Sequence, residues 1–200
     1  MTSSRVGVAQ LVAGVRHEAE RMTTLAQSFI NSSTFEARDY RFAVASLSSL
    51  RANNIEALAS SATARNVRVL LRPAPVHHDL IRADGEMLTQ SFDNTLGSAI
   101  RHSPHGATIC VGCSAEESLE AVVIIQDEGM GMTPAELDVL LKRAPGDDAA
   151  AVDAPPRDRN HGFGFAMARQ VGAAHDGWIS GWNMVGVGMT FAIGFPLLHA

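Results

Sequence analysis

The chain lacks several features that mark common protein classes. No apolar run approaches the length needed to cross a bilayer, and the first ten residues, MTSSRVGVAQ, lack the basic-then-apolar order of a signal peptide. Basic residues are scarce: 16 Lys and Arg stand against 21 Asp and Glu, so the net charge of -5 offers no electrostatic footprint for nucleic acid. We therefore expect a soluble, cytoplasmic chain with no nucleic-acid partner and no membrane contact by this stretch.

Potential metal ligands are also few. The two cysteines, Cys110 and Cys113, lie in the extended apolar segment ATICVGC, where residues three apart point to opposite faces of a sheet. No second cysteine pair completes a zinc set. His77 and His78 have no acidic or histidine partner at ligand spacing, so we interpret them as residues of a solvated loop.

The composition that remains, 46% hydrophobic and 18% charged residues, is sufficient for one well-buried domain with an appendage. The appendage is N-terminal, where apolar residues recur at alternating steps of three and four: Val8, Leu11, Val15, Met22, Leu25 and Phe29. This heptad seam predicts a long helix that packs against other helices. We therefore expect homodimers or higher association through it.

A strand followed by a glycine turn lies in the second half of the chain, in the segment LEAVVIIQDEGMGM. Ala121 to Ile125 form an apolar run rich in β-branched residues, which predicts a buried strand, and Asp127, Gly129 and Gly131 follow it. Glycine allows positive φ and close approach to a flat ligand, while the carboxylate accepts a hydrogen bond from an exocyclic amine. Adenine carries such an amine.

An amphipathic helix precedes this strand. Asp84 is a candidate N-cap of a helix that begins near Gly85, and its buried stripe consists of apolar residues: Leu88, Phe92, Leu96, Ala99 and Ile100. Polar residues recur on the opposite face at steps of three and four: Asn94, Ser98, Arg101 and His102. These side chains can converge on one ligand.

A second glycine turn, HGFGF, opens the helix AMARQVGAA. Such a turn leaves free backbone N–H groups that face an anion, and the helix dipole favours phosphate there. The remaining pattern predicts strands at 66–72, 107–113, 119–126 and 178–184, a last strand from Gly188, and helices at about 46–64 and 134–142. In the first of these helices we expect core contacts from Leu47, Leu50, Ile55 and Leu58.

In their order and separations, the segments LTQSFDNTLGSAIRHS, DEGMG and NHGFGFAMARQVGAAHDG resemble the N, G1 and G2 boxes of the ATP-binding domain of sensor histidine kinases, which are Bergerat-fold (GHKL) ATPases. The closing segment GMTFAIGFPL is similar to the family's last strand. The resemblance implies an α+β fold, a two-layer sandwich of a mixed sheet of about five strands and about three helices, preceded by the long N-terminal helix. It also implies transfer of the γ-phosphate of ATP to a histidine, with Mg²⁺ as cofactor.

The resemblance assigns roles residue by residue. Asp127 selects adenine, Asn94 and Arg101 act in catalysis, and Asn94 with Ser98 lies at the Mg²⁺ site. The implied ATP-binding residues are Asn94, Ser98, Arg101, His102, Asp127, Gly129, Gly131, Gly162, Phe163, Gly164 and Thr190. Ser98 departs from the family, which has a second asparagine there, and a serine hydroxyl is a shorter and poorer ligand for an ion that demands tight octahedral geometry. Metal-assisted catalysis depends on whether Ser98 can replace that asparagine.

The N-terminal phrase HEAERMTTLAQSFINSSTFEA resembles the second helix of the family's dimerisation and phosphotransfer hairpin. This divides the chain into a dimerisation helix at 1–34, a connector at 35–50 and an ATP-binding catalytic domain at 51–200. The helix that carries the phosphoacceptor histidine is then expected on another segment, and a response regulator is expected as partner. His17 lacks the continuation of the acceptor motif, so we interpret it as a surface histidine.

Three alternatives remain open from the residues. Ser98, Asn160 and the altered lid helix motivate a degenerate domain that binds nucleotide weakly or not at all and serves as a regulatory interaction module. Phosphorylation of His17 would instead define a histidine phosphotransfer protein that needs no ATP. A GHKL serine kinase of the anti-sigma type is the third, although the heptad helix and the connector EARDYRF favour two-component kinases.

Overall fold

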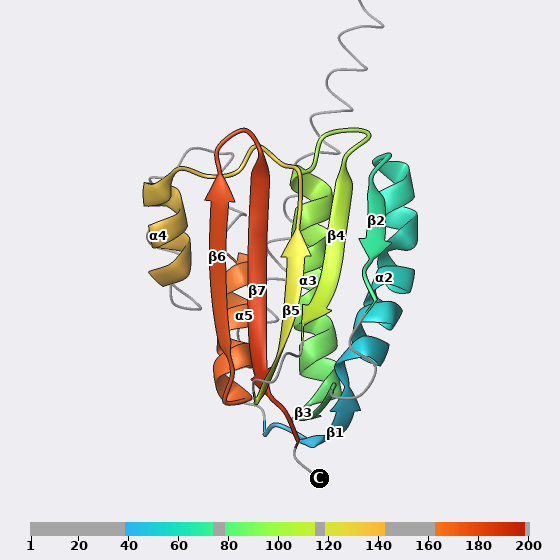
Figure 1. Cartoon of the computed structure of the whole chain (residues 1–200), viewed down its shortest axis with the longest axis vertical. Coiled ribbons are helices and arrows are strands. Elements are labelled where there is room, and N and C mark those ends of the chain that lie inside the picture. Colours follow the sequence, from blue (N-terminus) through green and yellow to red (C-terminus); the bar gives the residue numbers. More distant parts are fainter. Residues whose placement is uncertain (1–38, 74–78, 115–118, 143–162, 199–200) are drawn as a thin grey trace, which may run out of the picture. The chain divides into compact units, whose positions relative to one another are not determined.

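The computed structural model describes residues 39–73, 79–114, 119–142 and 163–198. The predicted N-terminal helix, His17, and the His77-His78 pair lie outside these residues. Tyr40–Ala200 form one compact unit. Its centre is a five-stranded sheet in the order β2-β4-β5-β7-β6, whose strands are β2 (Arg68–Leu71), β4 (Thr108–Ser114), β5 (Glu120–Gln126), β7 (Gly188–Pro196) and β6 (Trp178–Met184) (Figure 1).

The sheet is mixed: β2 runs parallel to β4, and the other neighbours are antiparallel. Residues of β4 and β5 alternate between buried and half-buried, as the period of two requires when only one face meets the core. Cys113 is buried and Cys110 half-buried, so the two free thiols are on opposite faces, as their spacing predicts. The predicted mixed α+β sandwich is confirmed.

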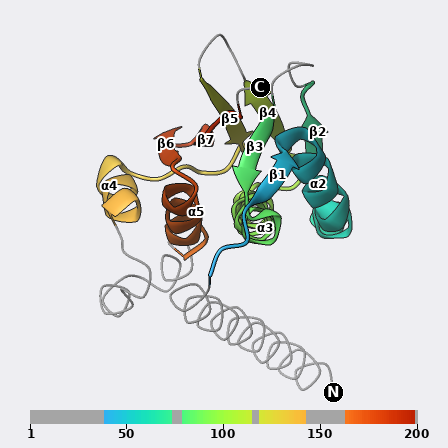
Figure 2. The same cartoon turned by 90° about the horizontal axis from the view of Figure 1, so that it is seen from below.

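Three helices form a layer on one face of the sheet: α2 (Leu47–Ala64), α3 (Gly85–His102) and α5 (Phe163–Ala174) (Figure 2). A fourth, α4 (Pro134–Lys142), lies at the β6 side of the molecule. None of the helices in the described ranges is long and apolar enough to cross a bilayer. The amphipathic stripe of α3 is buried as predicted, because Leu88, Phe92 and Leu96 are each 2% exposed or less.

The buried face of α2 differs from the expectation. Leu47 is buried, but Leu50, Ile55 and Leu58 are only half-buried. The other buried positions include two polar residues, Arg51 and Asn54. The Asn54 amide donates to the Thr89 carbonyl at 3.0 Å and to the Asp93 carboxylate at 2.6 Å, so a polar contact joins α2 to α3. A buried amide that is hydrogen-bonded in this way is tolerated in a core.

A second, two-stranded sheet was not anticipated by the sequence pattern. It pairs β1 (Ala43–Ser46) with β3 (Leu80–Ala83) in antiparallel register. Both strands have four residues, too few to display a clear alternation. β1 lies within the range expected as a connector, and the division into segments 1–34, 35–50 and 51–200 stays a prediction.

Asp84 joins three parts of this fold at the start of α3. One carboxylate oxygen accepts the backbone N–H groups of Glu86 and Met87, which caps the helix as predicted, and the other accepts the N–H of Arg41 at 2.8 Å. The Asp84 backbone N–H donates to Nε2 of His175, near the end of α5, at 2.9 Å. The start of α3 is thereby fixed to the chain before β1 and to α5.

His175 is held as a neutral imidazole. Its Nδ1 lies 2.6 Å from the Val171 carbonyl, so Nδ1–H donates there while Nε2 accepts from Asp84. The rings of Tyr40, Phe42 and Phe195 surround it edge-on. Burial lowers the pKa of His175 from its ordinary value, against the opposing effects of the Val171 carbonyl and nearby carboxylates. Protonation would remove the acceptor that Asp84 needs.

We predict that this histidine makes the domain less stable on acidification. Its pKa is lowered on folding, so below about pH 6.5 the unfolded chain binds the proton more readily, and the free energy of unfolding falls by up to about 1.4 kcal/mol per pH unit. Denaturant titrations at about pH 7.5 and 5.5 measure this loss. His175→Gln should flatten the dependence, whereas His105→Gln, at an exposed site, should leave it in place. Equal slopes for wild type and His175→Gln would contradict the assignment.

Candidate functional site

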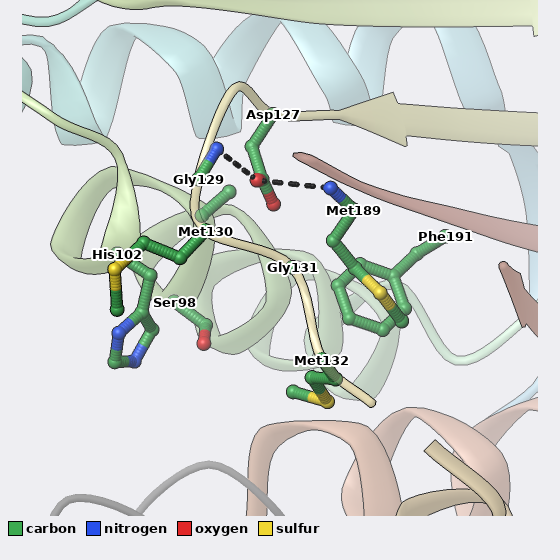
Figure 3. A pocket seen from close by; sticks show the side chains of 10 residues that line it. Ser98, His102, Asp127, Gly129, Met130, Gly131, Met132, Met189 and Phe191 are labelled. Atoms are coloured by element: carbon green, nitrogen blue, oxygen red, sulfur yellow. Dashed lines mark hydrogen bonds between the residues drawn. The ribbon is translucent and has the colours of Figure 1, made fainter. Parts of the chain in front are cut away.

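Asp127 follows the last residue of β5 and is 6% exposed. Its Oδ1 accepts the backbone N–H groups of Gly129 at 2.8 Å and Met189 at 3.2 Å, and its own N–H donates to the Met189 carbonyl at 2.9 Å. Figure 3 shows the second carboxylate oxygen directed away from both donors, into a pocket. Burial raises the pKa of Asp127, while the two backbone donors oppose this rise. A buried acceptor of fixed orientation therefore faces the pocket.

The turn after Asp127 requires glycine at two positions. Gly131 has a φ of +67°, which side chains rarely adopt. A Cβ on Gly129 would lie 2.8 Å from Asp127 Oδ1 and 3.1 Å from the backbone carbonyl oxygen of His102. The absence of a side chain at Gly129 therefore lets the turn approach the end of α3. Gly129 is needed for this close approach, and Gly131 is needed for its backbone conformation.

The pocket lies between this turn and the last turns of α3 (Figure 3). Its lining combines one carboxylate, two polar side chains of α3 and an apolar wall rich in methionine: Ser98, Ala99, His102, Asp127, Gly129, Met130, Gly131, Met132, Met189 and Phe191. Ser98 and His102 are one helical turn apart, so both side chains face the same side of α3. The structure thus brings together five of the predicted site residues, Ser98, His102, Asp127, Gly129 and Gly131.

Asn94, Arg101 and Thr190 lie outside this lining. The Asn94 amide donates to the sulfur of Met167 on α5 at 2.6 Å. Arg101 is exposed to solvent, and the Arg65 guanidinium donates to the Arg101 carbonyl at 2.7 Å. Two cationic side chains are therefore close together at the end of α3. Thr190 lies between two lining residues, Met189 and Phe191, and the Met189 backbone supplies the donor to Asp127.

The second glycine turn is described only in part. Gly162 lies outside the described residues, and Phe163 and Gly164 form the beginning of α5. This helix packs against α3. No group of three His, Cys, Asp or Glu side chains that could hold a metal occurs in the ranges that the structure describes. A Mg²⁺ site here would therefore depend on neutral oxygen ligands and on phosphate.

Asn183 on β6 is a site residue that the sequence pattern did not indicate. Its side-chain oxygen accepts the backbone N–H of Met132, at the far end of the glycine turn. In the hairpin that follows β6, the Gly186 N–H donates to the Met130 carbonyl at 2.7 Å. Together with the Met189 bonds, these contacts hold the whole turn from Asp127 to Met132 against the β6–β7 hairpin. The preorganised turn keeps the Asp127 carboxylate aimed into the pocket.

The family profile described as "Histidine kinase-, DNA gyrase B-, and HSP90-like ATPase" matches residues 83–199, which include α3, the Asp127 turn, α5 and both last strands. The chain belongs to this family of ATPases. The match covers the whole pocket lining described above.

Among relatives of this chain, the sensor histidine kinase WalK of Bacillus subtilis (strain 168) is 25% identical over 182 residues, 90% of this chain and 29% of WalK. The adaptive-response sensory kinase SasA of Synechococcus sp. (strain JA-3-3Ab) is 24% identical over 94% of this chain and 49% of its own length. This chain thus spans less than half of either relative.

Solved histidine kinases have the same fold. Full-length ShkA in complex with AMPPNP superposes with a TM-score of 0.72 at 18% identity, over 96% of this chain and 39% of that one. Acinetobacter baumannii AdeS gives a TM-score of 0.68 at 17% identity, over 93% of this chain and 83% of that one.

We predict that Asn183 contributes to nucleotide binding without touching the nucleotide. Asn183→Ala leaves the Met132 N–H without its acceptor, which should cost about 1 kcal/mol of stability and weaken nucleotide affinity as the turn loosens. Asn183→Asp keeps an oxygen acceptor at the same position and should retain both properties. Denaturant unfolding and nucleotide titration of the two variants test this. Wild-type affinity in Asn183→Ala would contradict the positioning role.

Proposed function

We propose that this chain is the ATP-binding catalytic portion of a sensor histidine kinase, which transfers the γ-phosphate of ATP to a histidine nitrogen and releases ADP. The observation that carries the proposal is the Asp127 carboxylate, buried beside an apolar pocket with one oxygen held by backbone N–H groups. The other oxygen is available to a donor in the pocket. The family match supports the same chemistry.

Adenine fits this site by its chemistry. Its exocyclic amine is a donor for Asp127, and its flat ring suits an apolar wall in which methionine side chains adapt to the ligand. Gly129 leaves space where any side chain would collide with Asp127 or with the end of α3. Asp127 must be ionised to be the stronger acceptor, so the raised pKa of this group links affinity to pH.

The phosphates would lie toward the polar face of α3 and the start of α5. His102 lines the pocket, and Arg101 and Arg65 place two guanidinium groups near the end of α3. Backbone N–H groups of Gly162 and Gly164 would hold phosphate oxygens at the start of a helix. These residues supply positioning and electrostatic stabilisation, which phosphoryl transfer chiefly requires.

In our proposal Asn94 and Ser98 would hold Mg²⁺, which would offset the negative charge of the phosphates. Ser98 lines the pocket, but the Asn94 amide donates to Met167 and would have to turn toward the ion. A water molecule between Ser98 and the ion would compensate for the short hydroxyl.

A degenerate domain that regulates through contacts, with little or no nucleotide turnover, is the second candidate. Two observations favour it: serine at position 98 in place of an amide ligand, and the engagement of Asn94 with Met167. In either case we propose a cytoplasmic location, homodimerisation through the seam of residues 8–29, and an acceptor-histidine helix and a response regulator as partners.

We predict that Asp127→Asn abolishes adenine recognition, because the amide cannot replace a charged acceptor held by two backbone donors. Affinity for ATP should fall by about 10- to 100-fold, the usual worth of a hydrogen bond to a charged group. Isothermal titration calorimetry measures it, with Glu128→Gln as the control that removes a neighbouring charge outside the pocket lining. Undiminished affinity in Asp127→Asn would remove the basis of the adenine assignment.

Ser98→Asn separates the two candidate functions. If wild type binds ATP with Mg²⁺ dependence, the kinase proposal stands and Ser98 is a tolerated ligand. The same titration without Mg²⁺ and with a non-hydrolysable analogue separates binding from turnover. If only Ser98→Asn binds, the pocket has the shape for nucleotide but lacks a metal ligand, and the regulatory module becomes the better description.

A further inference from the structure

The helices cover one face of the five-stranded sheet, and no element in the described ranges crosses the other face (Figures 1 and 2). The residues on this outer face follow from the strand register, because every second residue of each strand points the same way. In the three central strands they include Cys110 and Gly112 on β4, Val122 and Ile124 on β5, and Ala192 and Gly194 on β7. The centre of the face is therefore apolar, and its flanking strands carry small residues.

The two edges of this outer face differ in character. On the β6 edge lie Trp178 and Trp182, which are 39% and 51% exposed and are the only tryptophans of the chain. The Trp178 indole lies over Gly194, where a Cβ would collide with it, and its Nε1–H donates to the Glu120 carboxylate at 2.9 Å. The β6 edge is thus aromatic with an attached negative charge.

The β2 edge carries an exposed leucine and a cation. Leu70 is 52% exposed, and Arg72 continues the pairing of β2 with β4 through its N–H to the Val111 carbonyl. The Arg72 stem lies over Gly112, 3.9 Å from where a Cβ of that glycine would be. A guanidinium therefore lies on the sheet at the edge opposite the tryptophans.

The β2 edge and the β6 edge of this face are complementary in a pair of copies related by a two-fold axis. β5 is the middle strand of five, so a two-fold axis along β5 between two sheets packed face to face places β2 of one copy over β6 of the other. Leu70 then meets Trp182, which shares its level in the sheet, and Arg72 lies opposite Ser180, between the levels of Trp182 and Trp178, twice in each pair. Cation–π contacts between Arg72 and these indole rings surround a central contact between the two copies of Ile124. Glycine and alanine in the flanking strands allow the sheets to approach.

We propose that the outer sheet face, defined by Leu70, Arg72, Val122, Ile124, Trp178, Trp182 and Ala192, binds a second copy of this chain in an isologous pair. Leu70, Trp178 and Trp182 are exposed and lie around the half-buried Val122 and Ile124, and exposed apolar side chains gathered on one flat face are typical of interaction surfaces. The contact is separate from the seam of residues 8–29 and uses no residue of the pocket lining.

Tryptophan fluorescence reads this interface directly, because both tryptophans lie on it. On dilution of the chain of 200 residues, the emission maximum should shift to longer wavelength and acrylamide quenching should rise as the indoles become exposed to water. Sedimentation over the same concentrations should show the loss of one association step. An emission maximum that does not change with concentration would overturn the proposal, whether the face is always in water or always covered by a segment of the same chain.

Variants locate the contact. Ile124→Lys places two like charges face to face at the axis and should raise the dissociation constant of this step by ~100-fold or more. Val44→Lys, at a 67% exposed position of β1 outside this face, should leave association unchanged. Circular dichroism and thermal unfolding check that both variants fold.

Two substitutions at one position test the predicted orientation. Arg72→Glu should weaken association because a carboxylate replaces the cation that faces the indole rings, whereas Arg72→Lys keeps the positive charge and should retain most of the affinity. Equal affinities of Arg72→Glu and Arg72→Lys would contradict this orientation. If Ile124→Lys associates as tightly as wild type, the face is not the interface.

Discussion

The antiparallel pairing of β5 with β7 is the constraint on which the pocket depends. It runs in unbroken register from Glu120 opposite Pro196 to Gln126 opposite Thr190. Continued by one residue, it brings Asp127 beside Met189, where backbone bonds in both directions fix the carboxylate. A slip of one residue would turn every side chain of β5 to the opposite face, so the buried Val123 and Ile125 specify the position of Asp127.

The opposite wall of the pocket is α3, and its position is set at its far end. Asp84 caps the helix, accepts the Arg41 N–H and donates to His175, so the helix start is fixed by the β1 side and by α5 together. α3 is a rigid element of 18 residues, so this anchoring also places Ser98 and His102 relative to the Asp127 turn. The site thus depends on the neutral, buried His175, which contacts the start of α3, whereas the pocket lies at the end of this helix.

Local chemistry was predictable from sequence, and long-range pairing was not. The Asp84 cap, the glycines at 129 and 131 and the Trp178–Met184 strand follow from residue type and short-range pattern. Asn183 could not be found this way, because its partner is a backbone N–H 51 residues away along the chain. The local sequence WNM does not indicate that this asparagine accepts a hydrogen bond from a distant turn. The β1–β3 pair joins two four-residue strands, and α2 buries Arg51 and Asn54, where the apolar pattern pointed to leucines. In each case a tertiary contact outweighed the local signal.

Because side chains alternate along the central strands, the two faces of the sheet have different roles. Inward residues of β7, Met189 and Phe191, line the nucleotide pocket, while the intervening outward positions, Thr190 and Ala192, are directed to the uncovered face. The same register that aims Asp127 into the pocket therefore also aligns Ile124 with Ala192 and Gly112 on the other side. Association through the outer face would stiffen β5 and β7 directly behind the Asp127 turn. Nucleotide binding and self-association would then be coupled through the backbone of these two strands, with no side chain common to both sites.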